Sequence, residues 1–131
     1  MGKVWIVVIG LVALAIGAAI YLKPADTNKT SVLTFASVAQ DVAAGAKLYD
    51  VRTPDEFATS HFEGAKNWSL QDMQQGKLPD TLKDTKMYVY CHSGNRSGQA
   101  TQLLEQAGYS NVTDLGGLPD VEAIGGKLVT N

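Results

Sequence analysis

The sequence predicts an α/β domain in which helices cover a parallel sheet, preceded by one hydrophobic N-terminal helix. The aromatic and β-branched run Met87–Cys91 is typical of a buried strand, and the apolar positions of Arg96–Gly108 share one face of a helix. Asn111–Leu115 follows as a second strand. A strand, a helix and a strand at this spacing form a βαβ unit, whose two strands run parallel. With 131 residues, the chain has room for one such domain.

The hydrophobic helix is predicted from a long apolar run at the N-terminus. Val4–Leu22 contains 19 residues without a charge and is flanked by Lys3 and Lys23. A helix of this length measures roughly 28 Å, close to the hydrocarbon thickness of a bilayer. Residues 1–22 are therefore predicted to be a transmembrane anchor or a signal segment.

The flanks of this segment bear on its processing and on the location of the protein. Small residues at 17–19 resemble a signal cleavage site, but Ile20–Leu22 continues the apolar run beyond it, which favours retention. A short tail before the segment most simply stays inside, so we expect an inner-membrane anchor with the domain in the periplasm, or a periplasmic protein if the segment is cleaved. Polar residues 23–33 are predicted to be a linker, and 34–131 the globular domain.

Two further elements precede the βαβ unit. The apolar spacing of Phe35–Gly45 predicts a helix that ends at its glycine, and Lys47–Val51 is predicted to be a strand. Thr53 and Pro54 then have the residue types preferred at the N-cap and first position of a short helix.

Composition excludes several classes of protein. The formal net charge of -2 argues against nucleic-acid binding, which depends on Lys and Arg contacts to phosphate. One cysteine cannot close an intramolecular disulfide or supply a zinc site of several thiolates. A special role for Cys91 would therefore be chemical.

The predicted catalytic residue is Cys91, at the start of a loop that leads from a strand into a helix. Ligands of parallel sheets bind beyond the carboxyl ends of the strands, where this loop lies. Backbone N–H groups, the helix N-terminus and Arg96 all favour a thiolate, and Gly94 allows the backbone to curl around the sulfur with a positive φ. The alternative is an inert, buried cysteine. The predicted anion-binding loop comprises His92, Ser93, Gly94, Asn95 and Arg96.

The size of the loop separates two anion chemistries. Four residues lie between Cys91 and Arg96, one fewer than in the loops of cysteine-based phosphatases. A smaller ring of amides suits a single sulfur atom carried on the thiolate better than a tetrahedral oxyanion.

With these motifs the sequence resembles the rhodanese, or thiosulfate sulfurtransferase, family. Among its members it is most similar to the small single-domain periplasmic kind, the phage-shock type. The pattern departs from the family at Ser60, where Gly is common, and at Leu118, where Trp is frequent. The matching segments are Asp50–Arg52 with Glu56–Phe57, His61–Asn67, Tyr88–Ala100, Ala107–Val112 and Gly116–Leu118.

The resemblance implies a rhodanese-like parallel sheet of about five strands flanked by helices. It also implies a double displacement, in which Cys91 takes a sulfane sulfur from thiosulfate, a polysulfide or a persulfide and passes it to cyanide or a thiol. The expected partners are thus a small anionic donor, a thiophilic acceptor and, through the N-terminal helix, the membrane, with no nucleic acid. Neither a metal nor an organic cofactor is expected.

Four supporting residues have weaker predicted roles. Arg52 and Glu56 are predicted to form an ion pair that orders the turn, and the resemblance places them near the mouth of the site. Asp50 is expected to bind a backbone partner, and His61 to hydrogen bond within the Gly64–Ala65 turn. For the loop residue His92, contact with the donor and simple exposure both stay open.

Two other functions remain as alternatives. A non-catalytic rhodanese-like module would sense or bind a partner and would need no reactive thiol. A cysteine-based phosphatase or arsenate reductase would use the same loop for an oxyanion, although the loop length disfavours it.

Overall fold

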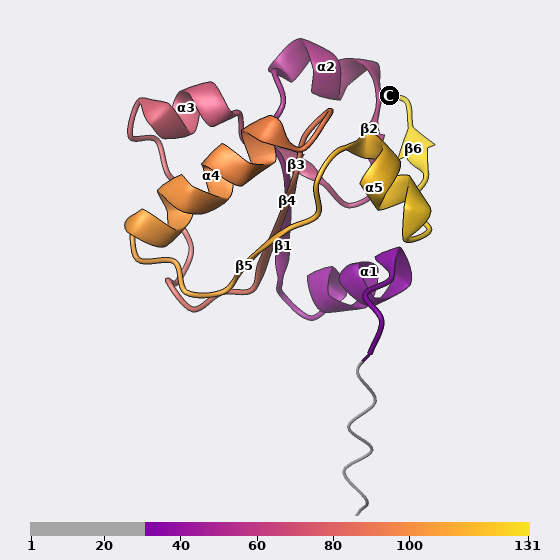
Figure 1. The fold of residues 1–131 in the computed structure, drawn as a ribbon, viewed down its shortest axis with the longest axis horizontal. Coiled ribbons are helices and arrows are strands. Elements are labelled where there is room, and N and C mark those ends of the chain that lie inside the picture. The colour runs from indigo at the N-terminus through magenta and orange to yellow at the C-terminus, as the bar shows by residue number, and fades with distance from the viewer. Residues whose placement is uncertain (1–30) are drawn as a thin grey trace, which may run out of the picture. The chain divides into compact units, whose positions relative to one another are not determined.

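The computed structural model describes residues 31–131, within which Val32–Asn131 form a compact unit. Its main sheet has four parallel strands in the order β3-β1-β4-β5 (Figure 1). The strands are β1 (Lys47–Asp50), β3 (Lys66–Asn67), β4 (Met87–Tyr90) and β5 (Val112–Asp114). The predicted membrane segment 1–22 and most of the predicted linker lie outside the described residues. Within residues 31–131, no helix is both long and apolar enough to cross a membrane.

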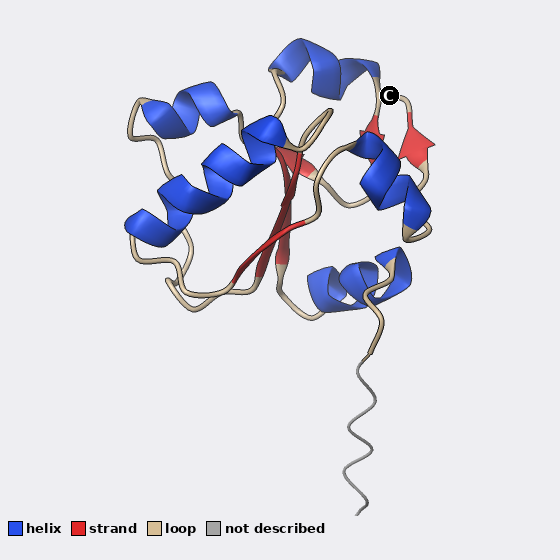
Figure 2. Cartoon of the chain, viewed as in Figure 1, coloured by secondary structure: helices blue, strands red, loops and turns tan. Residues whose placement is uncertain are grey.

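Helices cover both faces of the sheet (Figure 2). One face carries α1 (Phe35–Ala43) and α5 (Leu118–Ala123), and the opposite face carries α3 (Leu70–Gln74) and α4 (Asn95–Gln106). The remaining helix, α2 (Pro54–Thr59), follows β1. The structure therefore confirms the predicted α/β class with a parallel sheet between helices.

Two hydrophobic cores follow from the alternation of side chains along the strands. Tyr49 and Val89 point to the side of α3 and α4, where they pack with Leu104. Leu48 and Tyr88 point to the other side and join the core beneath α1 and α5. All four residues of β4 are buried because the strand lies inside the sheet and is covered on both faces.

The predicted helix starts and stops agree with the structure. The hydroxyl of Thr34 caps α1, and the chain leaves this helix through Gly45 at φ 114°. Thr53 caps α2, with Pro54 at its first position and Glu56 closing a capping box.

The expectation of about five strands in the parallel sheet is wrong. The other two strands, β2 (His61–Phe62) and β6 (Leu128–Val129), pair with each other in an antiparallel sheet of their own. The chain turns between β2 and β3, where Ala65 N–H donates to the Phe62 carbonyl and Gly64 has φ 82°, so β2 does not continue into the parallel sheet. A strand of two residues is too short to show an alternation of polar and apolar side chains, so β2, β3 and β6 were not predicted. The short helices α3 and α5 were not predicted either.

The order of the strands determines where a site can form. From β1 the chain moves outward to β3, then returns past β1 to β4 and continues outward to β5 on the other side. The direction of winding reverses between β1 and β4, which is where open parallel sheets form a crevice at their carboxyl ends. The segments that follow Asp50 and Tyr90 are thereby placed side by side.

Candidate active site

Cys91 lies immediately after β4, at the carboxyl edge of the sheet. Its side chain belongs to the core between the sheet and α3 and α4, and the residue is 0% exposed. The Cys91 N–H donates to the Gly116 carbonyl at 3.0 Å, which ties the start of the loop to the segment after β5. The sulfur is therefore held on a rigid strand end rather than on a mobile loop.

The loop curls back over the sulfur. The N–H of Gly94 donates to Cys91 Sγ at 2.9 Å, and Ser97 Oγ lies 3.5 Å from the same atom. Gly94 has φ 94°, the positive value predicted for it, and it precedes the first residue of α4. The Ser97 hydroxyl also contacts the Gly94 carbonyl at 3.1 Å, so the loop closes on itself around Sγ.

These contacts determine the acidity of the thiol. Burial of the sulfur opposes ionisation, but hydrogen bonds from the Ser97 hydroxyl and from the backbone N–H groups of Ser97, Gly94 and Ser93 outweigh it. The pKa of the Cys91 thiol consequently lies below its ordinary value. A larger fraction of the side chain is thiolate at neutral pH than in a free cysteine, and the thiolate is the nucleophilic form.

Ser97 was not among the predicted site residues. It is 0% exposed and lies on the buried face of α4 with Ala100 and Leu104. A hydroxyl on an otherwise apolar helix face, directly after the predicted loop, was the signal that could have identified it.

Gly117 was also missed, although the segment Gly116–Leu118 carried part of the family resemblance. A Cβ at Gly117 would lie 2.6 Å from the His92 carbonyl oxygen and 2.8 Å from Ser93 Cα. The Leu118 N–H donates to the same His92 carbonyl at 3.0 Å. Only glycine allows this segment to approach the cysteine loop so closely, so Gly117 packs directly against the backbone of His92 and Ser93.

Arg96 and Glu56 meet at the rim of the site. Arg96 Nη1 and Nη2 donate to Glu56 Oε2 and Oε1 at 2.7 and 2.8 Å, and each side chain is 32% exposed. The hydrogen bond from Arg96 lowers the pKa of Glu56 to about 2. The same pairing raises the pKa of Arg96, and the nearby Cys91 thiolate contributes to that rise.

The predicted ion pair between Arg52 and Glu56 is wrong. The Arg52 guanidinium instead binds the Asp50 carboxylate, with Nη2 to Oδ2 at 2.6 Å and Nε to Oδ1 at 3.0 Å. Both residues are buried, whereas Glu56 is turned outward by its capping contacts with Thr53. The sequence spacing allowed either carboxylate, and burial favours the pair in which each charge is satisfied.

The Asp50–Arg52 pair stabilises the turn that follows β1. Asp50 Oδ1 accepts from the Arg52 N–H at 2.9 Å, which is the predicted backbone partner, and Arg52 Nη2 donates to the Ser60 carbonyl at 2.6 Å. The Asn67 amide donates to the carbonyls of Asp50 and Arg52 at 3.0 and 2.9 Å. These contacts join β1, α2 and β3 beside the cysteine loop.

Three other predicted residues do not contact the sulfur in the structure. His61 Nδ1 lies 3.0 Å from the Phe57 carbonyl and its ring stacks on Phe57, so the expected bond within the Gly64–Ala65 turn is wrong. The side-chain oxygen Oδ1 of Asn95 accepts from Gln99 Nε2 at 2.6 Å, one turn further along α4. His92 is exposed, and its backbone carbonyl rather than its imidazole connects it to the rest of the site.

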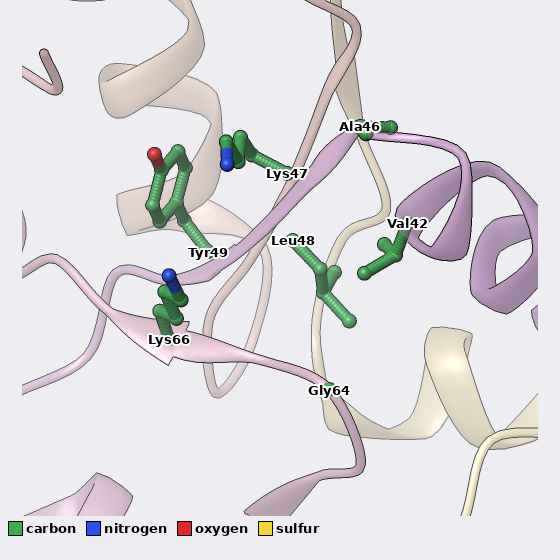
Figure 3. Close-up of a pocket in the computed structure, with 8 residues that line it drawn as sticks. Val42, Ala46, Lys47, Leu48, Tyr49, Gly64 and Lys66 are labelled. Carbon is green, nitrogen blue, oxygen red and sulfur yellow. The ribbon is translucent and has the colours of Figure 1, made fainter. Parts of the chain in front are cut away.

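A groove of about 310 Å³ lies beside Arg96. Val51 and Leu70 line it and also belong to the core that contains Cys91, so the groove adjoins the packing around the sulfur. A second pocket of about 180 Å³ includes Lys47 and Lys66 (Figure 3). It lies around the amino end of β1, at the opposite end of the strand from Cys91, and is not part of the candidate active site.

The fold and the site together define an α/β domain with a buried cysteine of lowered pKa at a strand end. Residues 34–123 match the rhodanese-like domain family. Thiosulfate sulfurtransferase PspE of Escherichia coli is 36% identical over 83 residues, which cover 61% of this chain and 78% of that protein. Thiosulfate sulfurtransferase 16, a chloroplastic protein of Arabidopsis thaliana, is 35% identical over 107 residues, which cover 71% of this chain and 88% of that protein.

A solved structure is similar along the same region. A rhodanese with anions from E. coli is 34% identical with a TM-score of 0.55, and the match covers 66% of this chain and 99% of that chain. The chain belongs to the rhodanese-like domain family, and it is an enzyme of the sulfurtransferase class.

Proposed function

We propose that the protein moves a sulfane sulfur from an anionic donor, thiosulfate or a polysulfide or persulfide, to cyanide or a thiol, with Cys91 as the carrier. The observation that supports this most directly is the backbone N–H of Gly94 at 2.9 Å from Sγ, beside the Ser97 hydroxyl. The family match over residues 34–123 includes this loop, and two relatives of the chain are named thiosulfate sulfurtransferase.

In the first step the Cys91 thiolate attacks the outer sulfur of thiosulfate. A Cys91–sulfur bond forms, the sulfur–sulfur bond of the donor breaks, and sulfite leaves with the electron pair. The loop N–H groups and the Ser97 hydroxyl stabilise the negative charge on the resulting persulfide, as an oxyanion hole stabilises an oxygen.

In the second step the acceptor attacks the outer sulfur of the persulfide. Cyanide becomes thiocyanate and a thiolate becomes a persulfide, while the electron pair of the broken bond returns to Cys91 as thiolate. The sequence of steps needs no external oxidant or reductant, because each attacking group supplies the electron pair of the new bond and each leaving group keeps the pair of the broken bond. Arg96 lies at the rim, in a position to meet an anionic donor.

The test is mass spectrometry of the intact protein after exposure to thiosulfate. We expect a gain equal to the mass of one sulfur atom, reversed by cyanide, and no gain in the Cys91→Ser variant. A thiol that reacts with neither thiosulfate nor iodoacetate would favour a non-catalytic binding module. Hydrolysis of an aryl phosphate would favour the phosphatase alternative.

The location of the enzyme is a separate proposal that depends on residues 1–22. We infer an inner-membrane anchor with the domain in the periplasm, or a periplasmic form after cleavage, from the apolar run Val4–Leu22. Cell fractionation followed by mass determination of the recovered N-terminus distinguishes the two forms. Recovery of the intact chain from the cytosolic fraction would contradict both.

A further inference from the structure

Arg96, the cationic residue at the rim of the site, already has an anionic partner. Both terminal nitrogens of its guanidinium are engaged by the two oxygens of Glu56, at 2.7 and 2.8 Å. This two-point geometry is the strongest that arginine forms with a carboxylate. It is also the geometry that an anionic substrate needs in order to bind arginine at two points.

Glu56 is fixed in place from its other side. Its Oε2 also accepts from the Thr53 N–H at 2.9 Å and from the Thr53 hydroxyl at 3.0 Å, within the capping box of α2. Its pKa of about 2 keeps it ionised at any working pH. The negative charge opposite Arg96 is therefore a permanent part of the rim.

The groove beside this pair contributes no further charge. Among the described residues that line it, Arg96 alone is charged. The other lining residues are apolar or bear uncharged amide and hydroxyl groups; they are Val51, Thr53, Ser69, Leu70, Gln71 and Gln74. An anion in this groove thus meets an Arg96 that is already paired with Glu56, rather than an isolated cation.

We propose that Glu56 is a specificity-determining residue that weakens the preference of the site for highly charged donors. An anion gains the two donors of Arg96 only in exchange for the Glu56 carboxylate, so a dianion such as thiosulfate has little advantage over a donor of smaller charge. The identity of the anion rests on the proposed sulfurtransferase function. The charge balance at the rim rests on geometry alone.

The test measures the charge preference at Cys91 without using sulfur transfer. Iodoacetate is anionic and iodoacetamide is neutral, and both alkylate the same thiolate. The rate with iodoacetate divided by the rate with iodoacetamide is therefore independent of changes in the thiol pKa. We expect Glu56→Gln to raise this ratio about fivefold at low ionic strength, with the gain lost in high salt. Gln keeps an amide oxygen that can accept from Thr53, which preserves the cap.

The matched control is Asp55→Asn. Asp55 lies next to Glu56 in the first turn of α2 and is exposed, so its variant removes the same charge without releasing Arg96. We expect the ratio to stay within experimental error of the wild type. An equal rise in both variants would show a general charge effect and would overturn the proposal.

Two further outcomes would also overturn it. An unchanged ratio in a folded Glu56→Gln protein would mean that Glu56 does not screen Arg96, and a lower ratio would mean that it only orients the arginine. If the Glu56→Gln protein fails to fold, the salt dependence of the wild-type ratio tests the proposal instead. That ratio should depend little on salt, and a strong dependence would contradict the proposal. A wild-type protein that takes no sulfur from thiosulfate would contradict the proposed function and leave this measurement intact.

Discussion

The carboxyl ends of β1 and β4 lie side by side, yet their polar groups are used differently. After β1, Asp50 and Arg52 form an ion pair, and Arg52 Nη2 also donates to the Ser60 carbonyl. After β4, donors converge on Cys91 Sγ, which carries no charged partner within hydrogen-bonding distance. We call the Asp50–Arg52 end the closed network, because its charges are paired within the turn that they stabilise. We call the Cys91 end the open network, because its acceptor, Sγ, can gain or lose a proton and can form a new covalent bond.

Burial explains why the two ends have these roles. A buried ion pair that loses one member leaves an uncompensated charge in the protein interior, so the Asp50–Arg52 pair resists exchange with a ligand. The Glu56–Arg96 pair is 32% exposed on each side, so water can replace either partner. Variants of the Asp50–Arg52 pair should therefore affect stability, and variants of the groups around Cys91 should affect reactivity.

The largest effect is expected at the closed network. Asp50→Asn removes the charge that balances buried Arg52 and should lower the free energy of unfolding by about 3 to 5 kcal/mol, measured by urea denaturation. Asp55→Asn, on the exposed side of α2, should change it by less than about 0.5 kcal/mol. Equal stability of the two variants would contradict the assignment of the β1 end to the framework of the fold.

The next effect tests the packing behind the open network. Gly117→Ala places a methyl group against the backbone of His92 and Ser93, so the loop must shift. We expect a loss of about 1 to 3 kcal/mol in stability and slower alkylation of Cys91. Gly98→Ala is the control, since its Cβ meets only Asp114 Oδ2 at an ordinary 3.7 Å and alanine favours the helix. A reactive, fully stable Gly117→Ala protein would show that the close approach has no function.

The third prediction concerns the acidity of the thiol. Ser97→Ala removes the hydroxyl beside Sγ, so the pKa of Cys91 should rise and the thiolate fraction at neutral pH should fall. The midpoint of the pH dependence of iodoacetamide alkylation measures this shift. Thr101→Ala removes a hydroxyl one turn later in α4, where it contacts only the Ser97 carbonyl, and should leave the midpoint unchanged. Equal midpoints in all three proteins would exclude Ser97 from the site.

The smallest effect is expected at the Glu56–Arg96 ion pair, which joins α2 to the cysteine loop. The pKa of Glu56 is held at about 2 in the folded protein, below its usual 4.5, so its pairing stabilises the fold above pH 4.5 and the contribution is lost as the pH falls towards 2. Because the pair is partly exposed, Glu56→Gln should cost only about 1 kcal/mol at neutral pH. Urea denaturation of both proteins from pH 7 to pH 2 should show the difference shrinking. A difference that grows on acidification would be inconsistent with the ion pair.

Features that depend on neighbouring residues could be predicted from the sequence. The strand at Met87–Tyr90, the caps at Thr53 and Pro54, the positive φ of Gly94 and the position of Cys91 at a strand end all depend on local pattern and local sterics. For that reason the α/β class and the reactive loop could be predicted without coordinates.

Contacts between groups far apart in the chain could not be predicted and depend on how the elements pack. The strand order β3-β1-β4-β5 brings the turn after β1 next to the cysteine loop, and it pairs Glu56 with Arg96, forty residues along the chain, instead of with Arg52. It also places Gly117 against His92 and divides the strands between two sheets. Pairing across such distances depends on which charges are buried together, and local sequence does not contain that information.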